Sequence, residues 1–148
     1  MKKSFKIGAF IGILVVVFGV FYSFSNIHKD YNAVLLAKGF SEVEKISVQF
    51  SGVRKFHIFS KFISGKITIK DKTYKVILDE DDIINKYEGV IIDTSSNLES
   101  EHGIIAEIYL SKNLNELYCY FKEDGSFIVA PVNDIEDAKS FFYDRGIK

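Results

Sequence analysis

The sequence predicts a mainly β protein. An N-terminal transmembrane helix precedes an antiparallel β-sandwich or small barrel of about seven or eight strands, which a C-terminal helix closes. Three observations lead to this prediction. Residues 7–27 contain no charged side chain. From residue 40 onward, apolar and polar side chains alternate in short runs separated by turn residues, as in antiparallel strands. Near the C-terminus, the spacing of apolar side chains changes to that of a helix.

The uncharged stretch 7–27 has the length of a membrane span. At about 1.5 Å rise per residue it would extend roughly 31 Å as a helix, which matches the hydrocarbon core of a bilayer. Three lysines lie within residues 1–6, whereas the flank after the stretch carries Lys29 next to Asp30. Because the more positive flank stays in the cytoplasm, we expect a cytoplasmic N-terminus at 1–6 and a single-pass signal anchor at 7–27. The anchor would contact membrane lipid and hold an extracytoplasmic domain at the cell membrane.

A cleaved and secreted form is the alternative. A secretory signal also begins with basic residues, but its apolar core is about 7–15 residues long and small residues precede the cleavage site. Ser23 and Ser25 would make a poor version of such a site, and the apolar stretch is longer than a typical core. A lipoprotein is excluded because no cysteine directly follows the stretch. The one cysteine, Cys119, is expected to be a small buried apolar residue.

The chain after the anchor changes from a helical to an alternating pattern. Residues 28–39 are expected to form a juxtamembrane stalk or short helix, for which Gly39 is a natural stop. The extracytoplasmic β-rich domain with its C-terminal helix is expected over 40–148, and residues 65–79 within it should form a hairpin. Strand-like runs are found at 46–50, 56–62, 66–70, 74–78, 87–93, 103–111, 116–122 and 127–131.

The closing helix is expected over residues 134–145. Asn133 or Asp134 can cap its N-terminus, and acidic residues in its first turn are favoured by the helix dipole. The strand that contains Tyr118 and Tyr120 is apolar on both faces. We expect the tyrosine face to lie under the helix, because the helix needs an apolar surface to cover. An exposed aromatic groove for a peptide, glycan or lipid is the alternative.

This order of elements resembles two known architectures. One is the pleckstrin-homology-like sandwich capped by a C-terminal helix, and the other is a small lipocalin-like barrel. The resemblance lies in the pattern of strands and helix and in no sequence motif. A fold by itself implies no particular ligand or activity.

The charge composition argues against a nucleic-acid partner. The segment 26–148 has 16 basic and 20 acidic side chains, a net charge of −4, and no dense basic block. We therefore expect no nucleic-acid partner. Lysine supplies 17 of the 19 cationic side chains, which is typical of an AT-rich bacterial genome.

Two acidic segments share some features with metal sites. In the loop 93–101, oxygen-bearing side chains fall at alternate positions, as in calcium loops, but Leu98 stands where a glycine is needed and Ile104 where a bidentate glutamate is needed. The run 79–82 consists of four adjacent acids, which in a strand point to opposite faces. We expect a polar connection and a solvated charge run, and so no metal or cofactor.

Catalysis is the least supported function. His102 lies beside Glu101 and near Glu107 in the sequence, but no nucleophile accompanies them. We predict no catalytic residue, and expect a binding or structural domain of the bacterial cell envelope. A small envelope hydrolase that uses His102 and Glu101, and a ligand carrier with an internal cavity, are the alternatives.

Overall fold

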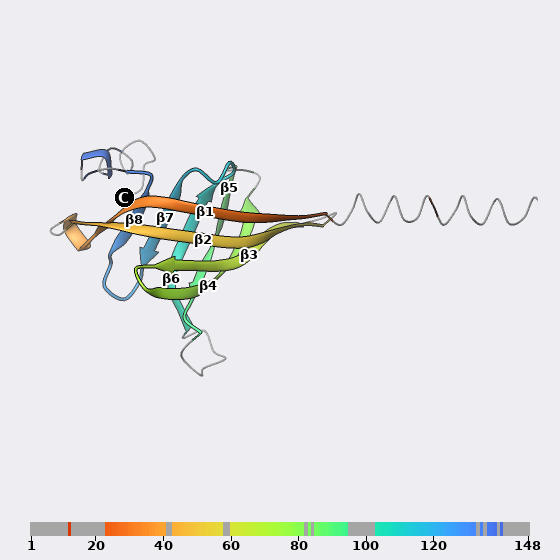
Figure 1. Cartoon of the computed structure of the whole chain (residues 1–148). Coiled ribbons are helices and arrows are strands. Elements are labelled where there is room, and N and C mark those ends of the chain that lie inside the picture. The colour runs from red at the N-terminus through yellow and green to blue at the C-terminus, as the bar shows by residue number, and fades with distance from the viewer. Residues whose placement is uncertain are drawn as a thin grey trace, which may run out of the picture.

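The chain forms a closed barrel of eight antiparallel strands in a computed structural model that describes residues 12, 23–40, 43–57, 60–81, 83, 85–94, 103–132, 134, 136–138 and 140 (Figure 1). Each strand pairs with the next along the chain, and the last pairs with the first. A short 3-10 helix, η1 (Lys38–Phe40), follows the first strand. The strands are β1 (Ser23–Leu36), β2 (Val43–His57), β3 (Ser60–Ile69), β4 (Lys72–Asp81), β5 (Lys86–Ile92), β6 (Ile104–Ser111), β7 (Leu117–Phe121) and β8 (Phe127–Ala130).

The predicted mainly β class is thus confirmed, and of the two predicted architectures the small barrel is correct. The register determines its width. A row of paired residues that starts at Phe24 on β1 passes once round all eight strands and returns to β1 at Val34, ten residues further along. Eight strands with this stagger tilt by about 40° and enclose a space that side chains can just fill.

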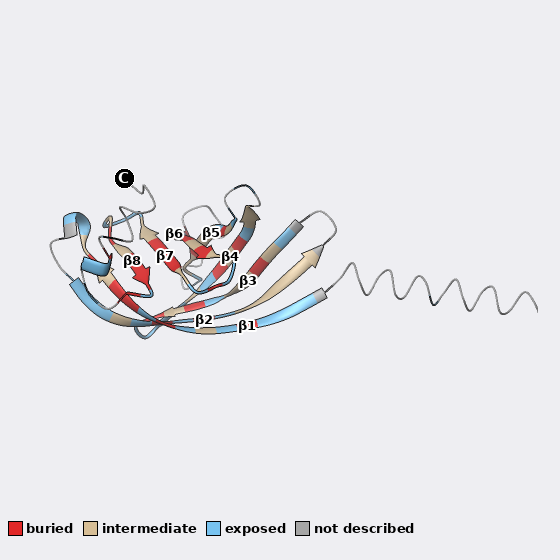
Figure 2. Cartoon of the chain, turned by 90° about the horizontal axis from the view of Figure 1, so that it is seen from above, coloured by how far each residue is buried: buried red, intermediate tan, exposed pale blue. Residues whose placement is uncertain are grey.

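The barrel interior holds the main hydrophobic core. Alternation along each strand directs every second side chain inward, and Figure 2 shows the resulting bands of buried residues on every wall. Cys119 belongs to this interior cluster and is fully buried, as predicted. The largest fully buried side chains of the cluster are Phe50, Ile63, Ile67, Leu78, Tyr87, Ile91, Ile108, Leu110, Leu117 and Ile128.

Two glycines let the walls curve. A Cβ atom at Gly89 would collide with the carbonyl oxygen of Ile77 on β4, and one at Gly65 with that of Ser51 on β2. Only a residue without a side chain permits backbones to approach this closely, which a strongly coiled sheet requires.

A second cluster covers the outside of β1, β7 and β8. Tyr118 is buried in it together with Ala138 of the C-terminal segment, whereas Tyr120 is only partly buried against the same cluster. Residues 136–138 and 140 are helical, and a carboxylate oxygen of Asp134 accepts hydrogen bonds from the backbone N–H groups of Glu136 (2.9 Å) and Asp137 (3.0 Å). The rest of the predicted helix 134–145 lies outside the described residues.

Residues 28–39 were predicted wrongly as a stalk or helix. They form most of β1 and the beginning of η1, because Tyr31 and Ala33 alternate into the barrel core. Val34 and Leu36 point the other way, into the outer cluster. With both faces buried, this part of β1 shows an unbroken apolar run instead of the alternation that marks a half-exposed strand.

The predicted span 7–27 overlaps β1, so residues 23–27 are extended and pair with β2. The remainder of the predicted span lies outside the described residues, apart from Gly12, which is helical. Among the residues that are described, no helix is both long and apolar enough to cross a bilayer.

Candidate functional site

The strand connections divide between two ends of the barrel, which we call the near end and the far end. At the near end, the chain enters β1 at Ser23, and the connections β2–β3, β4–β5 and β6–β7 lie there. At the far end lie the connections β1–β2, β3–β4, β5–β6 and β7–β8. Figure 1 shows β1 and β2 running between these ends as a long ribbon.

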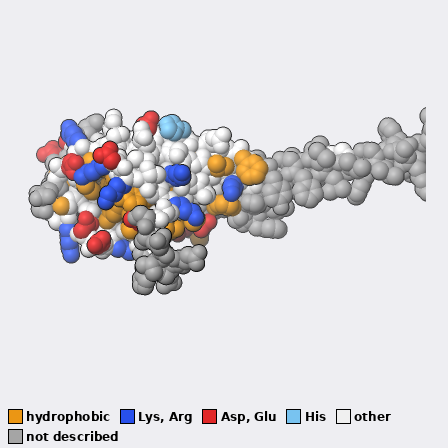
Figure 3. Space-filling view, turned by 60° about the horizontal axis from the view of Figure 1, so that its bottom comes forward, with side chains coloured by type: hydrophobic (Ala, Val, Ile, Leu, Met, Phe, Trp, Pro, Cys, Tyr) orange, Lys and Arg blue, Asp and Glu red, His pale blue; other side chains and the backbone are white. Residues whose placement is uncertain are grey.

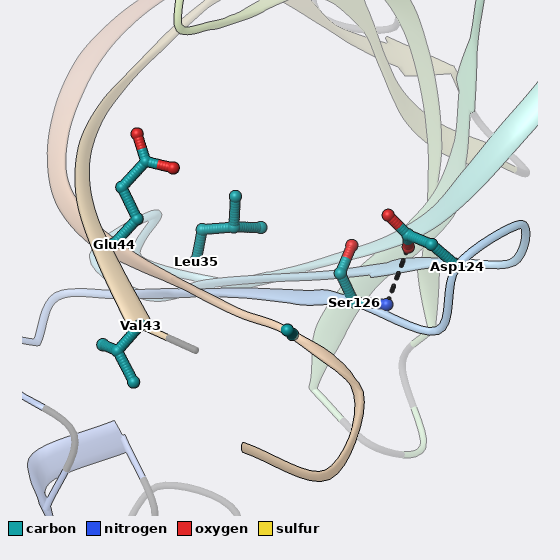
Figure 4. A pocket seen from close by; sticks show the side chains of 6 residues that line it. Leu35, Val43, Glu44, Asp124 and Ser126 are labelled. Atoms are coloured by element: carbon teal, nitrogen blue, oxygen red, sulfur yellow. Dashed lines mark hydrogen bonds between the residues drawn. The ribbon is translucent and has the colours of Figure 1, made fainter. Parts of the chain in front are cut away.

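The far end carries a hollow of about 510 Å³, which we call the far mouth (Figure 4). Leu35 faces the interior and packs against the core, and the carboxylates of Glu44 and Asp124 stand on opposite sides of it. Its lining residues are Leu35, Ala37, Val43, Glu44, Asp124 and Ser126.

Both far-mouth carboxylates are held in place. The ammonium group of Lys70, in the β3–β4 turn, lies 2.6 Å from a carboxylate oxygen of Glu44. The backbone N–H of Ser126 donates a hydrogen bond of 2.8 Å to Asp124. Hydrogen bonds from Ser126 lower the pKa of Asp124, so this group is ionised at neutral pH. The far mouth therefore offers fixed hydrogen-bond acceptors beside apolar surface.

The near end contains an inward-facing arginine. The guanidinium carbon of Arg54 lies 5.3 Å from the ring centre of Tyr87 and 5.9 Å from that of Phe56. Among the described residues, no group accepts a hydrogen bond from its buried Nε atom. Arg54 as a whole is half-buried, so the outer part of its side chain reaches accessible space.

Glu80 is the cross-strand partner of Tyr87 and is bound to two lysines. Its side chain is 3% exposed, and its carboxylate lies 2.9 Å from Nζ of Lys112 and 3.4 Å from Nζ of Lys61. Burial alone would raise the pKa of Glu80, but the hydrogen bonds and charges of Lys112 and Lys61 outweigh it and lower the pKa. Phe56 pairs with Lys61 across β2 and β3, and Glu80 pairs with Tyr87 across β4 and β5. We call these four residues together with Arg54 the near mouth.

The β6–β7 turn crosses the near end. Leu114 inserts into the interior cluster, and its carbonyl oxygen accepts a buried hydrogen bond of 2.8 Å from the hydroxyl of Tyr31 on β1. Lys29 donates to Asn115 in the same turn at 3.2 Å. Because Lys112 reaches Glu80 on β4, the turn is attached to walls on both sides of the opening. This part of the end is therefore closed by the protein itself.

A smaller hollow of about 400 Å³ lies beside the β3–β4 hairpin. Lys66 and Lys75 are directly opposite each other there, and the hydroxyls of Thr68 and Thr73 are 2.9 Å apart. Its lining residues are Ser64, Gly65, Lys66, Thr73, Tyr74, Lys75 and Thr94. None of the large, fully buried interior side chains lines this hollow or the far mouth.

Of the sequence-based catalytic candidates, the structure describes only Glu107. His102 and Glu101 lie outside the described residues. Glu107 projects from β6 next to Lys122, with 3.0 Å between their charged atoms, and the hydroxyl of Tyr109 donates to it at 3.5 Å. Burial raises the pKa of Cys119 far above its usual value, so its thiol stays protonated.

The structure describes only part of the two acidic segments. Of the loop 93–101, only Asp93 and Thr94 are described. In the run 79–82, Glu80 turns inward to its lysines, whereas Asp81 accepts a hydrogen bond from the backbone of Ile83 at 2.8 Å. Within the described part of the chain, no three metal-ligating side chains come together.

Sequence reasoning missed the near mouth. The sequence does contain a signal for it. Arg54 is separated from Phe50 and Phe56 by an even number of positions, so it shares their face of a strand. A cation on the apolar face of a strand predicts an inward charge, which needs a partner or a function.

The fold and its two mouths define a class: a closed, up-and-down eight-stranded barrel with polar groups at each end and an apolar interior. No protein-family model matches this chain, and neither does any curated protein or solved structure.

Proposed function

We propose that the chain is a tethered binding domain at the outer face of the cell membrane, with its ligand site at the far mouth. The observation that carries this proposal is that the uncharged stretch and the hollow lie at opposite ends of the barrel. The uncharged stretch leads directly into β1 at the near end, while the hollow opens at the other end. A protein anchored by that stretch would present the far mouth away from the lipid.

The outer surface of the near end supports the same orientation. Phe24 is 68% exposed there, and its cross-strand neighbour Lys55 lies over the ring of Phe62, 5.4 Å from its centre. Figure 3 shows hydrophobic and basic side chains side by side at this end. Aromatic and basic side chains together are favoured at the membrane–water interface.

The far mouth suits a small ligand that donates hydrogen bonds. Glu44, Asp124 and Ser126 supply oxygen acceptors, and Leu35 supplies an apolar floor. Mouths of small barrels are common sites for such ligands. We infer that the ligand carries hydroxyl or amino groups, as sugars, amino sugars and peptides do. A carrier with an internal cavity has less support, because the interior is occupied by packed side chains.

The orientation can be tested with tryptophan, which the chain lacks. Phe24→Trp and Val43→Trp would place a single reporter at exposed apolar positions of opposite ends. In vesicles of the full chain with brominated lipids, we expect fluorescence quenching for Phe24→Trp and little for Val43→Trp. A reporter enzyme that is active only outside the membrane, fused after Lys148, should also be active. An expressed but inactive fusion would contradict the topology, and so would equal quenching.

Ligand binding can be tested by thermal unfolding of the full chain with sugars, amino sugars and short peptides at millimolar concentration. A binder raises the unfolding temperature because it stabilises only the folded state. We expect Asp124→Asn to reduce this shift, and Asp79→Asn, an exposed change on the outer wall of β4, to leave it unchanged. Equal shifts in both variants would place the ligand elsewhere than the far mouth.

A further inference from the structure

Arg54 is an inward-facing cation for which the described residues provide no anionic partner. Its buried Nε has no hydrogen-bond acceptor among them. Glu80, the cross-strand partner of Tyr87, is paired with Lys61 and Lys112 instead. Confining a charge without a counter-charge costs free energy, because the lost hydration is not replaced. A methionine or leucine would fill the same space without that cost. The position of Arg54 therefore calls for a function rather than a packing role.

The surroundings of Arg54 show how an anion would be recognised. The rings of Tyr87 and Phe56 lie within 6 Å of the guanidinium carbon. Such ring contacts hold the guanidinium in position, while its N–H donors remain available for hydrogen bonds. A planar guanidinium presents those donors as a fork that matches two oxygens of a phosphate or carboxylate. The ammonium groups of Lys61 and Lys112 lie on the adjoining wall and turn and would favour a negative ligand.

We propose that the near mouth binds a phosphate-type oxyanion, with Arg54 as its principal ligand. The anion is either the headgroup of an anionic lipid or a free phosphate. This site is separate from the far mouth. Binding of a lipid headgroup rests on the proposed membrane anchor, whereas binding of free phosphate does not. Lys55 supplies a matched comparison, because it is the next residue on β2, carries the same charge and points to the outer wall.

The test uses the full chain in detergent micelles and in lipid nanodiscs, followed by circular dichroism during heating. Inorganic phosphate is titrated in micelles, and nanodiscs of phosphatidylcholine are compared with nanodiscs that contain phosphatidylglycerol. Wild type, Arg54→Met, Arg54→Lys and Lys55→Met are measured in parallel. We expect phosphate or phosphatidylglycerol to raise the unfolding temperature of wild type and Lys55→Met. The apparent Kd should rise about tenfold or more in Arg54→Met.

Each outcome separates the alternatives. Arg54-dependent stabilisation by inorganic phosphate identifies a soluble anion, and stabilisation by phosphatidylglycerol alone identifies a lipid headgroup. Equal responses of Arg54→Met and wild type overturn the proposal, and so does the absence of any response. If Arg54→Met does not fold, Arg54→Lys decides, since it keeps the charge and loses the fork: a wild-type response overturns the site, and a weakened one supports it. Failure of the outward topology would leave the phosphate result intact.

Discussion

The substitution Glu80→Gln tests whether burial strengthens the ion pairs of Glu80. The Glu80 side chain is 3% exposed and is bound by Lys112 and Lys61, which are 46% and 42% exposed. A hydrogen bond to a charged group contributes about 1.5–3 kcal/mol. Solvent around the lysines reduces the value of each ion pair. We therefore expect Glu80→Gln to lower the free energy of unfolding by about 2 kcal/mol at pH 7. The fold should persist, because glutamine has the same shape.

The matched control is Glu44→Gln. Glu44 pairs with Lys70 at a shorter distance, but these side chains are 55% and 49% exposed, so the loss should be below about 1 kcal/mol. Denaturant unfolding of the full chain in micelles would compare the two variants. If both substitutions lower the free energy of unfolding by the same amount, burial does not strengthen the ion pairs of Glu80.

The contribution of Glu80 to the free energy of unfolding should decrease at low pH. Because the pKa of Glu80 is lowered in the folded state, its contribution is complete above the unfolded pKa of about 4.3. That contribution is lost as the pH falls through the folded pKa. The difference in unfolding free energy between wild type and Glu80→Gln should be constant from pH 6 to 8 and shrink below about pH 4. A difference that persists unchanged at pH 2 would show that the carboxylate charge is not its source.

Three further predictions concern single buried groups. Tyr31→Phe removes the buried hydrogen bond to the carbonyl oxygen of Leu114, and should cost about 1–2 kcal/mol in denaturant unfolding without loss of the barrel circular dichroism spectrum. Gly89→Ala should destabilise by more than about 3 kcal/mol or prevent folding, because the new methyl group meets the backbone of β4; normal expression and unfolding would refute this. Cys119 should react with thiol reagents only after unfolding, since its thiol is fully buried and its pKa is raised; rapid labelling of folded protein would contradict that placement.

The fold was predictable where a strand has one polar face. The hairpin 65–79 was correctly expected, because Ile67, Ile69, Val76 and Leu78 enter the core while polar residues face outward. The prediction failed where both faces are buried, as in the second half of β1. It also failed in separating the runs 46–50 and 56–62, because residues 51–55 continue β2 without a break. There Gly52 pairs with Gly65 and serves the close approach of two strands rather than a turn.

The candidate sites were harder to predict than the fold, because they depend on closure. The far mouth joins Glu44 of β2 to Asp124 of the β7–β8 turn, and these meet only when β8 pairs with β1. No local pattern encodes that pairing, which involves three residues of each strand. At the near end, Arg54 and Tyr87 approach each other across the barrel from strands that are not neighbours. Sequence periodicity gives the face of each residue and not its partner across the lumen.

The start of β1 shortens the stretch that could serve as the proposed membrane anchor. Since β1 begins at Ser23, the uncharged stretch that remains for a membrane helix is residues 7–22. As a helix these residues would extend roughly 24 Å, which is shorter than the roughly 30 Å hydrocarbon core of a bilayer. A short span pulls its flanks into the interface or thins the bilayer, so an anchored barrel would have Phe24 and Lys55 at the level of the lipid headgroups.

The same shortening brings the stretch nearer to the length of a cleavable signal core of about 7–15 residues. Cleavage after Ser25, however, would remove residues that pair with Arg54 and Lys55 on β2. The proposed anchor, if retained, keeps these pairs of the β1–β2 ribbon, and a cleaved form would lose them.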